Sequence, residues 1–401
     1  MDTTRHVSLE AALLWSGRHA RHTDRYCYPQ LNLWRDFFPG NLGEHLARAA
    51  VGETLRAEFG AGELIEPYDR AQVRSFPAAS FPDHLPDGHP LAVHIGRFYP
   101  RKLLKDVTDF FSEDRRPFRV LGKSDDQLTV DFNHPFAGFK AAIELQITSE
   151  LSLKEEHGGR SNDLVIDLTD RGPGMQAARP DLDADFFGGN PFARLDSEPD
   201  ARFYAAPRLV QHLDASAIER VREIYRRFLS PRMKVLDLMS SWTSHLPEEI
   251  DGLDVTGLGM NREELEHNAR LTERVIHDLN ADPKLSLRDA QFDAAICTVS
   301  VEYLIHPIEV FREVARVLKP AAPFVITFSD RWFPPKAIAL WSEIHPFERM
   351  GLVSEYFRKS GGYNNLATES IRGLPRPAGD KYADRLALSD PVFAAWGYRR
   401  N

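Results

Sequence analysis

Cysteine and long apolar runs are scarce in this sequence. Only two cysteines, Cys27 and Cys297, occur among 401 residues, and their wide separation excludes the disulfide framework of a small secreted domain. No apolar stretch approaches the roughly 18 residues that span a bilayer, and the N-terminus does not open into an apolar run of signal-peptide length. We therefore expect a soluble, cytoplasmic protein without a membrane partner.

Clustered positive charge is also missing. Lys and Arg number 50 against 59 Asp and Glu, the formal net charge is −9, and the longest basic cluster is residues 100–105. A surface that follows nucleic-acid phosphates needs more basic groups than this, so no nucleic-acid partner is expected. The length allows two or three domains of about 150 residues, and the 42% hydrophobic content is sufficient for buried cores.

Residues 1–152 alternate short apolar runs with turns. Four runs have the character of strands: 91–95, 118–121, 128–130 and 141–147. The last of these alternates apolar and polar residues with period two, which is typical of a half-buried antiparallel strand. We expect a smaller antiparallel β or α+β domain here.

Residues 153–200 lose this periodicity. Glycine-rich breaks such as residues 172–174 and 188–191 alternate with acidic residues, which is typical of a linker. Aromatic residues, Phe186 and Phe192 among them, argue against a purely flexible one. We expect an irregular linker or lid segment, followed by a further domain over residues 201–401.

The C-terminal half alternates strands with helices. The predicted strands are residues 234–238, 253–257, 274–277, 292–297, 324–328 and 391–398. A helix capped by Asp214 or Ser216 precedes them, another starts at Asn261 with Glu264 in the capping-box position, and a third starts at Pro307. Near-continuously apolar strands between helices indicate an α/β fold, a doubly wound parallel sheet covered on both faces.

In such a sheet the ligand crevice lies beyond the carboxyl ends of the strands, beside the first one. Residues 237–247 follow that strand and bring hydroxyls, Trp242 and His245 into one tight loop. We expect a helix to begin near Pro247, so that its N-terminus and the free backbone donors of the loop suit a carboxylate or phosphate. An ordinary serine-rich turn is the alternative.

Several ordered segments of this half resemble class I S-adenosylmethionine-dependent methyltransferases: 235–238, 292–297, the helix ending in 316–320, strand 324–328 and the ending from Asp390. The resemblance covers residues 201–401. It implies a sheet of seven strands, with S-adenosylmethionine as cofactor across the ends of the first three. The cofactor-binding residues it implies are Arg208, Asp237, Met239, Ser240, Ser241, Trp242, Ser244, Gly257, Gly259, Met260, Asn261, Asp278, Leu279 and Ser300.

Three departures from the family pattern stand out. Residues 239–243 hold none of the glycines that the family has after the first strand, and Ala321-Ala322 replaces its later Gly-Gly. Gly259 stands where the family has an acidic residue that holds the ribose hydroxyls. The first change hinders close backbone approach to the cofactor, and the third removes a bidentate acceptor, which Asn261 restores in part. Asp278 keeps the family's acidic position after the third strand.

Residues 203–212 precede the first helix of the domain and are expected to cover the cofactor. Arg208 is expected to pair with the methionyl carboxylate, although a surface segment packed on the sheet is an equal alternative. The candidate catalytic groups are His245, His212, Tyr204 and Tyr303. We also expect the aromatic residues after the fifth strand on the acceptor side: Trp332, Phe333, Trp341, His345, Phe347, Tyr356 and Phe357.

Residues 128–138, with the strand through Ile147, resemble the closing hairpin of bacterial FKBP-type prolyl isomerases. Such isomerases need an aromatic cup that desolvates and twists the imide, and its members have no counterpart here that the sequence identifies. An FKBP-like docking or lid domain is therefore expected rather than an active isomerase.

The sequence thus predicts a methyltransferase that acts on a small molecule. A small thiol or sulfide suits an apolar site because its anion needs little beyond desolvation, while oxygen and nitrogen acceptors remain open. A non-catalytic scaffold with a methyltransferase fold and an FKBP-like folding helper are the alternatives. No metal site is expected, and the oligomeric state is left open.

Overall fold

The computed structural model describes residues 5–84, 91–105, 113–152 and 161–401. It divides into two compact units. The N-terminal unit comprises residues 1–19, 30–191 and 344–352, and the C-terminal unit comprises residues 20–29, 192–343 and 353–401. The predicted boundary at 152–153 borders residues outside the described ranges, and the one at 200–201 lies within the C-terminal unit.

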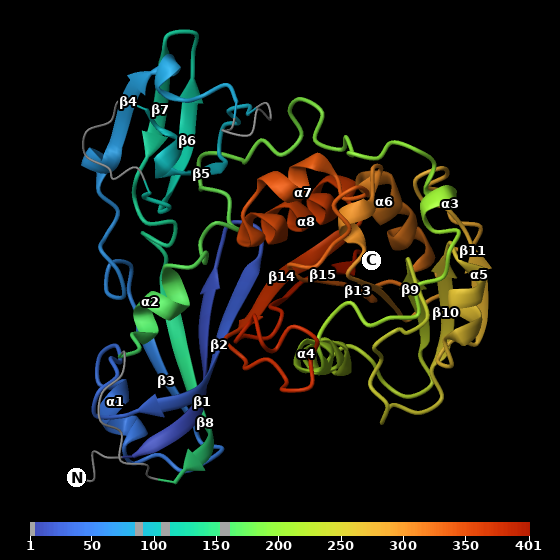
Figure 1. Ribbon diagram of the computed structural model, residues 1–401, viewed down its shortest axis with the longest axis horizontal. Helices are drawn as coiled ribbons and strands as arrows, with labels where there is room; N and C mark the ends of the chain where they lie inside the picture. Colours follow the sequence, from blue (N-terminus) through green and yellow to red (C-terminus); the bar gives the residue numbers. More distant parts are fainter. Residues whose placement is uncertain (1–4, 85–90, 106–112, 153–160) are drawn as a thin grey trace. The chain divides into compact units, whose positions relative to one another are not determined.

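The N-terminal unit is built from antiparallel sheets (Figure 1). Its elements are β1 (His6–Ser16), α1 (Leu42–Leu46), β3 (Thr54–Phe59), β4 (Val73–Pro77), β5 (Phe98–Pro100), β6 (Pro117–Lys123), β7 (Gln127–Asp131), β8 (Ala141–Leu151) and α2 (Leu164–Thr169). Strand β8 pairs with both β1 and β3, and a second sheet has the order β4-β7-β6-β5. The antiparallel character is as predicted, whereas the FKBP-like fold stays a prediction.

One predicted strand of this unit is wrong. Residues 91–94 have no regular structure, and the neighbouring strand β5 begins only at Phe98. Leu91 and Val93 instead pack against an aromatic core that includes Tyr99 and Phe118. These apolar side chains are thus partly buried although they belong to a loop, and periodicity alone does not distinguish such a loop from a strand.

The C-terminal unit carries a mainly parallel sheet between helices. Its elements are α3 (Asp200–Phe203), α4 (Ala215–Arg226), β9 (Lys234–Leu238), β10 (Asp254–Gly259), α5 (Arg262–His267), β11 (Glu273–Ile276), β12 (Ala294–Thr298), α6 (Pro307–Val317), β13 (Pro323–Phe328), α7 (Ala339–Glu343), β14 (Tyr363–Arg372) and β15 (Val392–Arg399). Two further elements, β2 (Arg21–Asn32) and α8 (Pro346–Ser360), have residues in both units.

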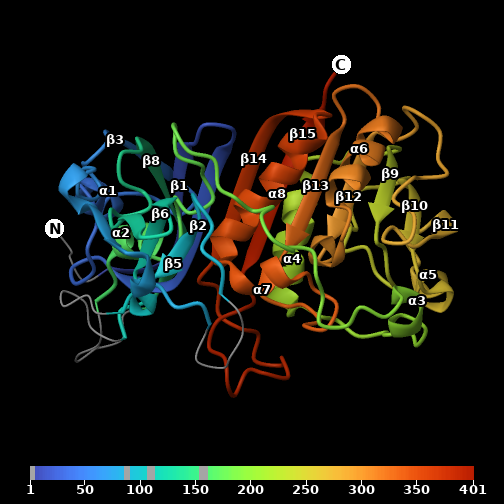
Figure 2. The same ribbon diagram turned by 90° about the horizontal axis from the view of Figure 1, so that it is seen from above.

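The strands of this unit follow the order β11-β10-β9-β12-β13-β15-β14-β2 (Figure 2). The five predicted parallel strands form as β9 to β13, and the last strand, β15, pairs antiparallel with β13 as the resemblance implies. The predicted count of seven is exceeded among the described residues. Strand β2 adds to the sheet, because its residues 21–26 pair in parallel with residues 367–372 of β14.

Helices cover both faces of this sheet (Figure 1). Asp214 caps α4 as predicted, since its side chain accepts from the backbone N–H of Ala217. The buried stripe of α4, with Val221 and Ile224, packs on one face of the sheet. On the other face Phe311 of α6 packs against Phe324 with ring centroids 5.1 Å apart. No helix in the described part of the chain is long and apolar enough to cross a membrane.

Candidate functional site

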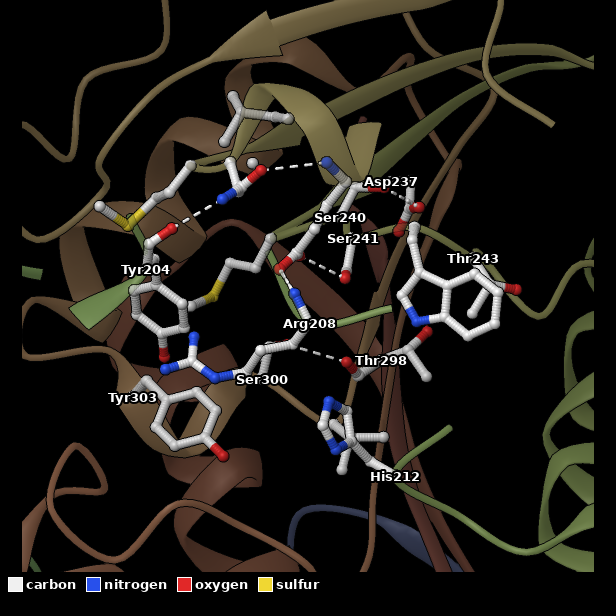
Figure 3. Close-up of a pocket in the computed structure, with 18 of the residues that line it drawn as sticks. Tyr204, Arg208, His212, Asp237, Ser240, Ser241, Thr243, Thr298, Ser300 and Tyr303 are labelled. Atoms are coloured by element: carbon white, nitrogen blue, oxygen red, sulfur yellow. Dashed lines mark hydrogen bonds between the residues drawn. The ribbon is translucent and has the colours of Figure 1, made fainter. Parts of the chain in front are cut away.

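A pocket opens at the carboxyl ends of β9, β10, β11 and β12 (Figure 3). From β9 the strand order runs through β10 to β11 on one side and through β12 to β13 on the other. The order therefore reverses at β9, and the ligand crevice is expected at the strand ends there. The structure brings most of the predicted site residues to it: Tyr204, Arg208, His212, Asp237, Met239, Ser240, Ser241, Trp242, His245, Gly259, Met260, Asn261, Asp278, Leu279, Ser300 and Tyr303.

Two predicted site residues lie outside the pocket lining. Ser244 is buried beside it and accepts a hydrogen bond from Asn268 Nδ2 at 2.8 Å, so it supports the loop instead. Gly257 lies within β10, where an added Cβ would approach Leu271 Cδ1 to 2.4 Å. The need for glycine at that position is therefore one of core packing.

The loop after β9 keeps a glycine-like backbone without a glycine. Met239, the first residue of the rewritten motif, has φ +57°, in the left-handed region that glycine normally occupies. Ala321, at the family's later Gly-Gly, has φ +61°. Non-glycine residues rarely hold this conformation, and such strain gathers at functional sites. The tight turn is thus retained, at a cost in backbone energy.

The predicted helix after this loop is wrong. Residues 241–250 contain no helix, and Leu246 and Pro247 are buried in irregular structure. Side chains replace the helix as the support of the loop, because Asn268 Nδ2 donates to the Ser241 carbonyl at 2.8 Å. The expected positive end of a helix is therefore not a source of anion binding here.

Asp237 places a buried carboxyl group at the end of β9. Its residue is 2% exposed, and the carboxylate accepts a hydrogen bond from Ser240 Oγ at 2.6 Å. Burial raises the pKa of Asp237 to about 6, although the hydrogen bonds from Ser240 and Ser244 oppose the shift. A cation in the pocket would favour the charged form of this group.

The end of β10 explains the missing acidic residue. Ser240 N donates to the Leu258 carbonyl at 2.7 Å, which draws the β9 loop across β10. A Cβ on Gly259 would consequently lie 2.2 Å from the Ser240 carbonyl oxygen. Any side chain at position 259 would collide with backbone, so an acid cannot occupy this place in the observed loop conformation.

The segment over residues 203–212 is held across the pocket by side chains from two loops. Asn261 Nδ2 donates to the Tyr204 carbonyl at 2.9 Å, and Trp242 Nε1 donates to the Val210 carbonyl at 3.1 Å. Glu264 Oε1 accepts from Arg208 N at 2.7 Å. Asn261 caps α5 as predicted, but the Glu264 carboxylate serves these tertiary contacts and its side chain forms no return bond of a capping box.

Arg208 lies in an aromatic surround on the pocket wall. Its guanidinium carbon is 4.4 Å from the ring centre of Phe203 and 5.3 Å from that of Phe333, and Nη2 donates to the Phe203 carbonyl. The buried Nη1 has no hydrogen-bond partner among the described residues. Figure 3 shows the side chain running toward Tyr204 and Tyr303. A carboxylate ligand would satisfy this donor.

The candidate bases differ in protonation. Burial raises the pKa of Tyr204 and, well above its ordinary value, that of Tyr303, so both phenols stay protonated at neutral pH. Burial lowers the pKa of His245 to about 4 and also lowers the pKa of His212. Both imidazoles are therefore neutral at pH 7. His212 packs edge-to-face on Phe333, with ring centroids 5.2 Å apart.

After β11, Asp278 Oδ1 accepts from the backbone N–H groups of Asn280 and Ala281. Asn280 Nδ2 in turn donates to Asp200 Oδ2 and to the Tyr303 carbonyl, both at 2.8 Å. Asn280 thereby connects the loops after β11 and β12 to α3. This residue had no role in the sequence prediction.

Of the aromatic residues predicted on the acceptor side, Phe333 lines the pocket. Its backbone N–H donates to the Tyr303 hydroxyl at 2.9 Å. Tyr356 and Phe357 pack instead against Phe311 in the core, and Trp341 packs on Phe328. Their predicted location on the acceptor side is wrong, because the apolar face of a helix packs against the sheet rather than facing a ligand.

The pocket also contains residues that were not predicted as site residues: Asp200, Val210, Gln211, Leu213, Thr243, Leu258, Glu264, His277, Asn280, Thr298 and Val299. Position alone identifies some of them, since Thr298 ends the strand β12 and Val299 follows it directly. No local signal indicates Glu264 beyond its capping position. Among the residues that the structure covers, no group of three or more His, Cys, Asp or Glu is arranged to hold a metal ion.

Residues 240–326 match the family model of a methyltransferase domain. Solved structures similar to the chain include S-adenosylmethionine-dependent methyltransferases from Archaeoglobus fulgidus (17% identity, 45% of this chain and 94% of that chain, TM-score 0.33) and Aquifex aeolicus (16%, 46% and 98%, TM-score 0.29). No curated protein matches the chain. The domain match supports a methyltransferase and implies S-adenosylmethionine as the cofactor.

The residues of the pocket fit this cofactor. The unsatisfied Nη1 of Arg208 suits a carboxylate, and the buried carboxyl group of Asp237 suits a cationic group. Met260 and Leu279 line the pocket at the ends of β10 and β11, where they offer apolar surface to a flat ring. The closed position of Gly259 leaves no room for the acidic residue that the family has there.

Proposed function

We propose that the C-terminal unit is an S-adenosylmethionine-dependent methyltransferase that acts on a small acceptor molecule. The observation that carries this proposal is that Arg208, with its unsatisfied Nη1, and the buried carboxyl group of Asp237 line one pocket at the strand ends. When bound, S-adenosylmethionine supplies a sulfonium methyl group that is open to in-line displacement. Arg208 binds the carboxylate of its amino-acid end, and Asp237 faces the positively charged amino group.

The acceptor side is formed by His212, Tyr303 and Phe333. The rings of Tyr303 and Phe333 stack with their centroids 6.0 Å apart and exclude water from that wall. The Tyr303 hydroxyl stays protonated and is a donor that orients the methyl acceptor. His212 is the base that we favour, because it is neutral at pH 7 and its ring packs on Phe333 at the acceptor side. His212 takes up the proton when the methyl acceptor carries one.

The formal net charge of −9 and the lack of a basic cluster favour a small molecule over a nucleic acid. A thiol or hydrosulfide requires the least of this site, since its anion forms close to neutral pH and needs mainly desolvation. Phenols and amines need the base to a greater extent. The nature of the acceptor therefore decides how strongly turnover depends on His212.

Calorimetric titration of S-adenosylmethionine and S-adenosylhomocysteine into the full chain tests the proposal. We expect dissociation constants of about micromolar size, as is usual for working enzymes. A screen of small thiols, phenols and amines by mass spectrometry then identifies the acceptor, and His212→Asn should lower its turnover about 100-fold or more if it carries an ionisable proton. Absence of binding at millimolar ligand would make this unit a non-catalytic scaffold.

A further inference from the structure

Glu264 is a buried acid in the middle of the ligand crevice that the proposed function leaves unused. It belongs to α5, is 8% exposed, and lines the pocket. Lone carboxylates are rarely buried to this extent, because their desolvation costs several kcal/mol unless partners compensate. Its presence next to the closed position of Gly259 requires a reason.

Each of the two carboxylate oxygens of Glu264 accepts one hydrogen bond from the protein. Oε1 accepts from Arg208 N at 2.7 Å, and Oε2 accepts from Ser241 Oγ at 2.6 Å. A carboxylate oxygen has about two acceptor positions, so each oxygen keeps one for a further donor. Two parallel acceptors on one carboxylate match two neighbouring hydroxyl groups, as in a ribose 2′,3′-diol.

The alternative place for such an acceptor is blocked. The Ser240 carbonyl oxygen would lie 2.2 Å from a Cβ at position 259, so the end of β10 offers no side chain to a diol. Asn261, the other polar residue near this position, is already engaged. Its Nδ2 donates to the Tyr204 carbonyl, and its Oδ1 accepts from Glu264 N. Glu264 is thus an acid of the pocket that keeps acceptor capacity and forms no salt bridge with a described residue, and it lies on the helix that begins directly after Gly259 and Asn261.

We infer that Glu264 is the ribose-binding acid of this site, moved from the end of β10 to the first turn of α5. The inference rests on the proposed function, because the diol belongs to the ribose of the cofactor. Its contacts with Arg208 N and Ser241 Oγ hold the carboxylate in one orientation, so the segment over residues 203–212 and the β9 loop together position it.

The test compares two ligands and three proteins by calorimetry: S-adenosylhomocysteine against its 2′-deoxy analogue, with wild type, Glu264→Gln and Glu266→Gln. Glutamine can retain both protein contacts, since its oxygen accepts from Arg208 N while its amide donates to Ser241 Oγ. Glu266 is exposed on the same helix and controls for the change of charge. Thermal unfolding of each variant checks that it is folded.

We expect wild type and Glu266→Gln to bind S-adenosylhomocysteine about 10- to 100-fold more tightly than the deoxy analogue, as for a hydrogen bond to a charged group. Glu264→Gln should reduce this ratio to about threefold or less. If the Glu264→Gln variant keeps the wild-type ratio, whether both ligands bind equally more weakly or bind as before, the inference is overturned and Glu264 is a structural contact. If wild type binds neither ligand, the proposed function itself fails, and the ribose role fails with it.

Discussion

The carbonyl oxygen of Ser240 occupies the space that a side chain at position 259 would need. A Cβ on Gly259 would approach this oxygen to 2.2 Å, and the backbone of Ser240 is fixed there by its hydrogen bond to the Leu258 carbonyl. The loss of the glycines after β9 and the loss of the acid after β10 are therefore one change rather than two. The rewritten loop crosses β10 where the acid would stand.

Restoring the family's acid should consequently harm the protein. Gly259→Asp places a branched, charged side chain against backbone, and we expect the free energy of unfolding to fall by about 3 kcal/mol or more. Denaturant unfolding measures the change. Gly379→Asp, at an exposed glycine with open space around it, is the control and should have little effect. A stable Gly259→Asp variant with tighter cofactor binding would show that the loop gives way.

A second prediction concerns Asp237 and pH. Its pKa is about 6 in the folded chain, above the ordinary value of 3.8, so the folded state holds the proton longer than the unfolded state. Stability from this group is complete below the ordinary value and is lost as the pH rises through about 6, by about 3 kcal/mol in total. Asp237→Asn does not titrate and should escape this loss.

Unfolding of wild type and Asp237→Asn at several pH values measures the effect as a difference between the two curves. We expect the variant to gain on wild type between about pH 4 and pH 7. Asp251→Asn, on an exposed turn, should run parallel to wild type. A constant difference across this range would mean that Asp237 is charged at all of these pH values.

The strands of the parallel sheet could be predicted from the sequence because burial on both faces forces near-continuous apolar runs, as in residues 234–238. The same reasoning does not find β2. Its partner, β14, is distant in the sequence, and a pairing between distant strands leaves no local pattern. Fold class thus follows from composition along the chain, whereas the full strand list depends on tertiary contacts.

The candidate site divides in the same way. Asp237 and Asp278 were predictable because they stand at the carboxyl ends of strands, and strand ends meet at one edge of a parallel sheet. Glu264 was not predictable as a pocket residue, since its spacing from Asn261 equally fits a capping box. Its carboxylate turns to Arg208 N and Ser241 Oγ, and only the folded chain brings these donors within reach.

His245 should make the protein sensitive to acid. Its pKa is about 4 in the folded chain against an ordinary 6.5, so the neutral form is favoured by folding. The resulting stability is present above the ordinary value and is lost as the pH falls through about 4, by about 3 kcal/mol. The residue has φ +49°, a conformation that asparagine tolerates well, so His245→Asn is the suitable neutral replacement.

Thermal unfolding between about pH 4 and pH 7 tests this prediction, with His267→Asn as an exposed control. The His245→Asn variant should lose less stability than wild type as the solution becomes acidic. The Asp237 effect has the opposite sign in the same interval, so the double variant separates the two contributions. If His245→Asn follows wild type at every pH, the imidazole is open to water and titrates normally.

Arg208 gives the most direct test of how a ligand lies in the pocket. We expect Arg208→Met to weaken S-adenosylhomocysteine binding about 10- to 100-fold, because the charged, partly buried partner of the carboxylate is lost. Binding of 5′-methylthioadenosine, which lacks the amino-acid end, should change by less than about threefold. Methionine keeps apolar contact with Phe203 and Phe333, which limits disturbance of the aromatic surround.

Calorimetry with both ligands separates a carboxylate contact from a general loss of the pocket. Arg312→Met, on the exposed side of α6, is the matched control and should bind both ligands as wild type does. Arg208→Lys keeps the charge but not the planar, bidentate donor pair, so its affinity for S-adenosylhomocysteine should fall between those of wild type and Arg208→Met. Equal weakening of both ligands by Arg208→Met would place the guanidinium in the architecture of the 203–212 segment and not on the ligand.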